Sequence, residues 1–205
     1  MVTMDETAMW QTIDSERAAT ADLLAGLTDV EWTYPSLCEG WTVREVAAHL
    51  SFADRVGVGT AFKAFVRARG SFNRMVDQTA RAEARRPTAE IVANVRGAVE
   101  HHRLAPGQTL KNALMDIMVH TQDITLPLGI ERHMPIDAAV VAAEDLWRMG
   151  FPFHARRRLA GHRLVATDAD WSAGEGTEVS GPIEALVMLL AGRTATIPRL
   201  TGIKV

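Results

Sequence analysis

The stretch Leu114–Asp123 constrains this chain most, because it places two potential metal ligands on one turn of a predicted helix. Apolar side chains and a threonine recur there at spacings of three and four: Leu114, Ile117, Thr121 and Ile124. Asp116 and His120 are four residues apart, so they project from one face with Cβ atoms about 5–6 Å apart. A carboxylate and an imidazole at this separation can bind the same cation. Two ligands do not complete a site, so another part of the chain must supply the rest.

A third candidate ligand, His49, lies in a predicted helix with a well-marked start. Thr42 and Glu45 have the spacing of a capping box, in which each side chain accepts the backbone N–H of the other residue. Trp41 and Val46 occupy the two positions of a hydrophobic staple. His49 follows Val46 by three residues, on the inward side of the helix. A single histidine on such a face is more often a hydrogen-bonded core residue than a ligand.

Taken together, His49, Asp116 and His120 favour a divalent metal centre. A carboxylate without a partner is costly inside a helical bundle, and a divalent cation would compensate it. Two histidines, one carboxylate and an open position are a common arrangement for catalytic zinc and for some non-haem iron sites. The sequence therefore predicts a metal site between two helices.

Three neighbouring residues have competing interpretations. Glu45 precedes His49 by four residues and could be a rival ligand, but the complete capping signature favours a capping role. Asp123 could orient the imidazole of His120 from outside the ligand shell, or it could bind an arginine at the helix end. Cys38, just ahead of the capped helix, could be a nucleophile or a ligand, although a buried structural cysteine is the favoured interpretation.

Periodicity predicts a mainly α protein, with an antiparallel four-helix bundle over residues 1–133 and a helix with a small α/β region over residues 134–205. Helices are predicted in the first part over residues 5–26, 42–53, 60–84 with an interruption at 70–71, 89–103 with a cap at Thr88, and 109–125. Helices over 137–149 and 183–191 and strands over 162–167 and 177–180 are predicted in the second part, with a further strand after 168–171 and a tight turn at 174–176. The aromatic loop 31–41 is expected to pack against the bundle.

Composition argues against several classes of partner. The chain has 205 residues, is 47% hydrophobic and carries a formal net charge of −3, without a basic block. Nucleic acid is therefore not expected as a partner, and no apolar run reaches the length of a membrane span. The single cysteine excludes an internal disulfide, and the first residues lack the layout of a signal peptide. We expect a soluble, cytoplasmic protein that does not bind membranes.

The segments around the candidate ligands resemble one known family. Pro35–Leu50 (PSLCEGWTVREVAAHL) is similar to the first metal motif of the mycothiol-dependent maleylpyruvate isomerases, whose metal-binding N-terminal domain belongs to the wider DinB-like group of four-helix bundles. Val119–Ile124, with Pro127–Gly129, resembles the second metal motif. Asp170–Gly176, Val179–Pro182 and Ala191–Arg193 resemble the C-terminal region of uncharacterised members of the family.

The resemblance implies a metal, a cofactor and a set of ligands. In the isomerase, a histidine of the first motif and a Glu-x-x-x-His pair of the second hold a divalent ion, which corresponds here to His49, Asp116 and His120. Zinc is the expected metal, with nickel or iron as alternatives, and mycothiol is the implied thiol cofactor. Aspartate replaces the glutamate of the isomerase and is one methylene shorter. The isomerase is also expected to have a C-terminal domain larger than the segment after residue 135.

Two functions follow from these observations. The first is a divalent-metal-dependent enzyme that uses a small-molecule thiol and an electrophilic substrate, either as an isomerase or as a mycothiol S-transferase. The second is a non-catalytic metal-binding bundle that acts by partner binding or sensing. A closed shell of four protein ligands would favour the second, and an open position in a pocket would favour the first. A homodimer is a further possibility.

Overall fold

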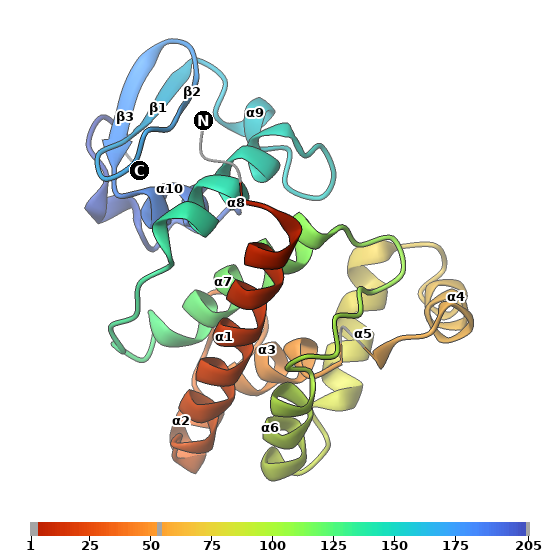
Figure 1. The fold of residues 1–205 in the computed structure, drawn as a ribbon. Coiled ribbons are helices and arrows are strands. Elements are labelled where there is room, and N and C mark those ends of the chain that lie inside the picture. Colours follow the sequence, from red (N-terminus) through yellow and green to blue (C-terminus); the bar gives the residue numbers. More distant parts are fainter. Residues whose placement is uncertain (1–3, 53–54, 204–205) are drawn as a thin grey trace.

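The computed structural model describes residues 4–52 and 55–203 and is mainly helical, as predicted (Figure 1). The helices of the first part are α1 (Glu6–Ala25), α2 (Asp29–Trp32), α3 (Val43–Leu50), α4 (Val58–Arg67), α5 (Phe72–Glu83), α6 (Thr88–Gly97) and α7 (Leu110–Thr125). Helix α1 packs on α6 and α7, and α3 packs on α6 and α7 from the other side, so these four helices form the bundle. Helix α5 lies against α3, and α4 contacts α5 at the edge of the molecule.

The second part is a helical and β region in which α8 (Ile136–Arg148) and α10 (Ile183–Leu190) pack on each other. Between them come the short helix α9 (Ala155–Arg158) and the strands β1 (His162–Ala166), β2 (Ser172–Gly174) and β3 (Thr177–Gly181). β1 is the central strand of the sheet; it pairs antiparallel with β2 and parallel with β3. A short 3-10 helix, η2 (Ile197–Arg199), follows α10.

The tight turn predicted between β2 and β3 is confirmed, and its glycines have a steric reason. Gly174 has φ +83° and Gly176 has φ +119°. A Cβ atom on Gly176 would lie 2.1 Å from the carbonyl oxygen of Gly161, so no side chain fits there. This close approach lets β3 turn back and pair with β1.

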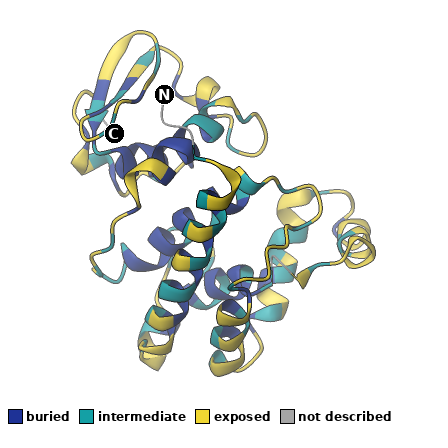
Figure 2. Ribbon diagram, in the orientation of Figure 1, coloured by how far each residue is buried: buried dark blue, intermediate teal, exposed yellow. Residues whose placement is uncertain are grey.

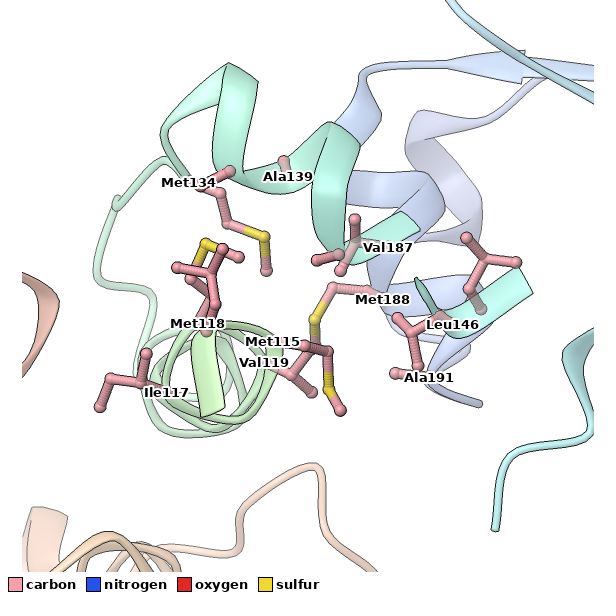
Figure 3. Packing of buried hydrophobic residues seen from close by; sticks show 14 of the residues in the cluster. Met115, Ile117, Met118, Val119, Met134, Ala139, Leu146, Val187, Met188 and Ala191 are labelled. Carbon is pink, nitrogen blue, oxygen red and sulfur yellow. The ribbon is translucent and has the colours of Figure 1, made fainter. Parts of the chain in front are cut away.

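The bundle and the second part share one buried core. Three side chains of α7, Met115, Met118 and Val119, lie opposite residues of α8, of α10 and of the segments beside these helices (Figure 3). Leu146 on α8 and Met188 on α10 are almost completely buried in this contact. The division of the chain at residues 133 and 134 therefore stays a prediction, because the apolar cluster continues across it.

Several predicted boundaries need correction. The interruption predicted at residues 70–71 is present and divides the stretch 60–84 into two helices, because the chain turns at Gly70, which has φ +73°; only the start moves, to residue 58. Thr88 lies inside α6, and Pro87 is the N-cap, without a side-chain hydrogen bond. Helix α6 also ends near residue 97 rather than 103. Side chains of α1 explain this early end, since Arg17 donates to the Ala98 carbonyl and Asp14 accepts the Glu100 N–H.

The aromatic loop is packed against the bundle, with one exception. Trp32, at the end of α2, is 3% exposed, and Leu37 and Trp41 are partly buried against the core. The Leu37 N–H donates to the Asp123 carbonyl of α7 at 3.1 Å. Tyr34 does not fit the prediction, because it is 46% exposed.

None of the described helices is both long and apolar enough to cross a bilayer. Helix α4 differs from the others in its exposure. None of its 10 residues is buried, which Figure 2 shows as a ribbon without dark blue at the edge of the molecule.

Candidate metal centre

Helices α3 and α7 bring the three predicted ligands together. Helix α3, with Thr42 as its N-cap, supplies His49 one residue before its end, while α7 supplies Asp116 and His120 from one face. Asp116 Oδ1 lies 3.6 Å from His49 Nε2 and 3.5 Å from His120 Nε2. One potential ligand atom from each residue lies within 4.8 Å of the other two, a spacing that a single ion could bridge.

His120 is held by a hydrogen bond on the far side of its ring. Its Nδ1 lies 2.9 Å from Asp123 Oδ2, and a carboxylate can only accept, so Nδ1 carries the proton of this bond. The other nitrogen, Nε2, then faces Asp116 and is available as a ligand. A histidine oriented by a carboxylate in this way is characteristic of metal sites.

Arg193, in the segment after α10, is a residue of the site that the sequence did not reveal. Its Nε donates to Asp123 Oδ1 at 2.9 Å and its Nη2 donates to Asp123 Oδ2 at 2.6 Å. The carboxylate of Asp123 is fully buried. Both proposed roles of Asp123 therefore occur together, because one carboxylate orients His120 and binds an arginine. Only the tertiary fold brings residue 193 to α7, so spacing in the sequence carries no signal for it.

Charge within the cluster outweighs burial in setting the pKa values. Burial would raise the pKa of Asp116, but His120 and His49 hold it well below its ordinary value. Burial would lower the pKa of His120, yet Asp116, Asp123 and Cys38 together raise it well above its ordinary value. Burial likewise opposes the low pKa of Asp123, which is maintained by His120 and Arg193. The cluster therefore holds two ionised carboxylates beside a cationic imidazole, and a metal ion would take the place of a proton.

Cys38 lies beside this cluster, on the Asp123 side of the His120 ring. Its thiol donates to Asp123 Oδ2 at 3.0 Å, and Arg193 Nη2 lies 3.4 Å from the sulfur. Cys38, His120 and Asp123 also lie close enough together to hold an ion. Asp123 already binds Arg193 through both oxygens, so this second group is the poorer metal site.

Glu45 is not directed to the metal cluster by its hydrogen bonds. Its carboxylate accepts the Thr42 N–H at 2.9 Å and the Thr42 hydroxyl at 2.5 Å. The predicted capping box is therefore present, and the carboxylate of Glu45 is engaged at the start of α3.

The three ligand side chains open onto a cavity of about 780 Å³. Its walls come from α4, α5 and α7 and from the loops around residues 105–108 and 149–153. A second, smaller hollow lies on the other side of His120 and is lined by Cys38, Trp41 and Arg193, among others. The cluster thus separates two spaces, and its ligand side faces the larger one.

Residues 13–109 match the model of the family described as the mycothiol maleylpyruvate isomerase N-terminal domain. The N-terminal part of the chain belongs to this family. The matched segment includes Cys38 and His49 and ends before Asp116 and His120. Among curated proteins, none matches the chain in sequence.

Solved structures of the maleylpyruvate isomerase have the same fold as this chain. A crystal structure of the mycothiol-dependent maleylpyruvate isomerase is 14% identical in sequence, covers 98% of this chain and 95% of its own, and gives a TM-score of 0.66. A histidine-to-alanine mutant of that enzyme is 13% identical, with the same coverage and a TM-score of 0.67. The expectation of a larger C-terminal domain in the isomerase is wrong for this structure, because almost all of that chain is matched.

Proposed function

We propose that this protein is a divalent-metal-dependent enzyme that uses a small-molecule thiol, mycothiol, to act on an electrophilic substrate as an isomerase or an S-transferase. The observation that carries the proposal is the position of three potential ligands at the wall of a large cavity. The family of the N-terminal domain and the fold shared with the isomerase support it.

The donor set fits a divalent ion held by His49, Asp116 and His120. Zinc is the metal that two imidazoles and one carboxylate suit best, with nickel or iron as alternatives. An ion held by these residues would supply an open position facing the cavity, where a thiol is deprotonated to the nucleophilic thiolate. The short side chain of Asp116 is compatible with this role, since its Oδ1 already lies between the two imidazoles.

The residues around the ligands orient them before any ion binds. Asp123 fixes the ring of His120 through Nδ1, and Arg193 fixes the carboxylate of Asp123 from the C-terminal part of the chain. The thiol of Cys38 donates a further hydrogen bond to the same carboxylate. The walls of the cavity on the ligand side of the cluster are mainly apolar.

The alternative function is a non-catalytic bundle whose metal is structural and which acts by partner binding or sensing. It would need a fourth protein ligand to close the shell. Among the described residues, Cys38 and Asp123 are the nearest candidates for a fourth ligand. Both contact Nδ1 of His120, whereas the metal would bind Nε2 on the opposite side of the ring. The open cavity on the ligand side favours the enzyme.

Metal content of purified variants tests the ligand set. His49→Ala should lose most of the metal, because the two remaining ligands come from a single helical turn. Asp116→Asn should weaken binding because it removes the anionic ligand. Glu45→Gln is the matched control: it lies one turn from His49, it keeps a capping partner for Thr42, and it should retain the metal.

Circular dichroism establishes that each variant is folded, and binding of mycothiol to wild type and His49→Ala tests the thiol. Mycothiol should bind only where the metal is present. A folded His49→Ala protein with full metal content would overturn the ligand assignment. Mycothiol binding that is independent of metal would favour the alternative function. The cytoplasmic location and the homodimer stay predictions.

A further inference from the structure

The cavity beside the metal cluster has an unusually apolar wall for the site of a small polar substrate. Its lining includes four phenylalanines and three methionines: Phe52, Phe72, Phe151, Phe153, Met75, Met115 and Met149. Its volume of about 780 Å³ lies in the range of pockets that enclose drug-sized ligands. A short dicarboxylic acid would leave most of this surface uncovered. The walls therefore suit a ligand with a large apolar body.

The charged groups of the lining are distributed unevenly. Apart from the metal cluster, they are Lys63, Arg67 and Glu83. Glu83 is neutralised by Arg86, whose Nε lies 2.6 Å from the carboxylate. Lys63 and Arg67 form no ion pair with the residues that the structure describes. Among the residues that the structure describes, the cavity lining thus presents two unpaired cations and no unpaired anion outside the cluster.

Both cations lie on the face of α4 that borders the cavity. They are four residues apart, and Thr60 and Ala64 of the same helix line the cavity beside them. Phe62 lies on the opposite face, is 67% exposed and does not line the cavity. Lys63 and Arg67 therefore line the cavity while remaining exposed to solvent, and Phe62 lies on the outer face of α4.

We propose that this cavity binds an amphipathic anion, a carboxylic acid with a bulky apolar body. The body lies against the phenylalanine and methionine side chains, and the carboxylate lies toward Lys63 and Arg67. This inference rests on the proposed function for the reaction itself, in which the acid carries the electrophilic double bond. It names the substrate class as an unsaturated carboxylic acid with a large apolar substituent.

Three test compounds distinguish the contribution of the apolar body from that of the carboxylate. Isothermal titration of the full-length protein would use naphthylacrylate, the corresponding neutral alcohol, and fumarate. Naphthylacrylate has both an apolar body and a carboxylate, the alcohol lacks the charge, and fumarate lacks the body. We expect naphthylacrylate to bind about tenfold more tightly than the alcohol, from two partly solvated ion pairs, and fumarate to bind most weakly.

Variants of the wall identify where the ligand binds. Lys63→Met together with Arg67→Met should reduce the affinity for naphthylacrylate to that of the alcohol, with no change for the alcohol. Arg69→Met is the matched control, an exposed cation of the same segment that does not line the cavity. Met75→Glu should weaken both aromatic ligands by introducing a charge into the apolar wall. Phe62→Glu, on the outer face of α4, should weaken neither.

The outcomes are distinct. If fumarate binds as tightly as naphthylacrylate, the cavity does not require an apolar body. If naphthylacrylate and the neutral alcohol bind equally, Lys63 and Arg67 do not recognise the carboxylate. Unchanged binding in folded Met75→Glu would place the ligand outside this cavity. If the protein binds naphthylacrylate but His49→Ala keeps its full metal content, the proposed function is wrong and the cavity assignment still holds. Metal and mycothiol binding without any binding of naphthylacrylate would remove only the cavity assignment.

Discussion

Asp123 and Arg193 lie 70 residues apart in the sequence and are joined by two hydrogen bonds, of 2.9 and 2.6 Å. The carboxylate is fully buried, and the same oxygen that accepts the shorter bond also accepts from His120. A residue after the last long helix is therefore connected, through one carboxylate, to the imidazole of the metal cluster. The orientation of His120 therefore depends on the segment after α10 as well as on α7.

Asp123→Asn should weaken metal binding without removing a ligand. The amide cannot hold the imidazole and the guanidinium as an anion does, so His120 loses its fixed orientation. We expect the affinity for Zn²⁺ to fall about 10–100-fold, measured by competition with a chelator of known affinity. Asp77→Asn is the control, because Asp77 also accepts from an indole and an arginine but does not touch the cluster. Unchanged affinity in Asp123→Asn would show that His120 needs no outer partner.

Arg193→Met should destabilise the fold, because it leaves the buried carboxylate of Asp123 without its arginine. Breaking a buried ion pair on one side costs about 3–5 kcal/mol of unfolding free energy. Denaturant titration of the metal-free protein would measure this loss. Arg81→Met, which breaks an exposed ion pair with Asp77, should cause little change. Equal stability of Arg193→Met and Arg81→Met would contradict the role assigned to the buried pair.

Metal binding should release a proton from His120 at neutral pH. Burial would lower the pKa of His120, but Asp116, Asp123 and Cys38 raise it well above its ordinary value of 6.5. The metal-free protein therefore holds His120 protonated, and coordination must displace that proton. Calorimetric titration with Zn²⁺ in two buffers of different ionisation enthalpy should give release of about one proton per ion. The absence of any release at neutral pH would place the metal elsewhere.

The same pKa shifts set the pH dependence of stability in the metal-free protein. The raised pKa of His120 contributes stability below pH 6.5, which is lost as the pH rises through the raised value. The lowered pKa of Asp116 contributes stability above pH 3.8, which is lost as the pH falls. Thermal melts in the presence of a chelator should therefore give the highest melting temperature between these values, and Asp116→Asn should flatten the profile.

Cys38→Ala should keep the full metal content. The thiol contacts Asp123 and the Nδ1 side of His120, while the ligand set uses the opposite nitrogen. Metal analysis of this variant beside His49→Ala distinguishes the two candidate groups. Loss of metal in Cys38→Ala, with retention in His49→Ala, would assign the ion to Cys38, His120 and Asp123 instead.

A fragment of residues 1–133 should not form a stable bundle, although the sequence predicts a boundary there. Its α7 would expose Met115, Met118 and Val119, which pack against α8 and α10 (Figure 3). It would also lose Arg193 and leave the buried carboxylate of Asp123 without its arginine. Circular dichroism and denaturant titration of the fragment, compared with the full chain, check this. A cooperative unfolding transition in the fragment would establish the predicted boundary.

The sequence predicts the ligand set because the signals for it are local. The spacing of Asp116 and His120 and the capping box before His49 fix which faces these residues share. The mainly helical class follows from the same periodicity, and the tight turn follows from Gly174 and Gly176. Arg193 could not be predicted, because its partner lies on a helix far away in the sequence. The end of α6 was missed for the same reason, since side chains of α1 bind its last backbone groups.

None of the side chains of α4 is buried, and its main neighbour is α5. Its separation from the bundle would expose little core surface, so the free energy of local opening should be far below that of global unfolding. Its amides should therefore exchange with deuterium well before those of α7. Ligand entry can then proceed by transient detachment of this one wall, on a timescale set by α4 alone and not by the stability of the whole protein.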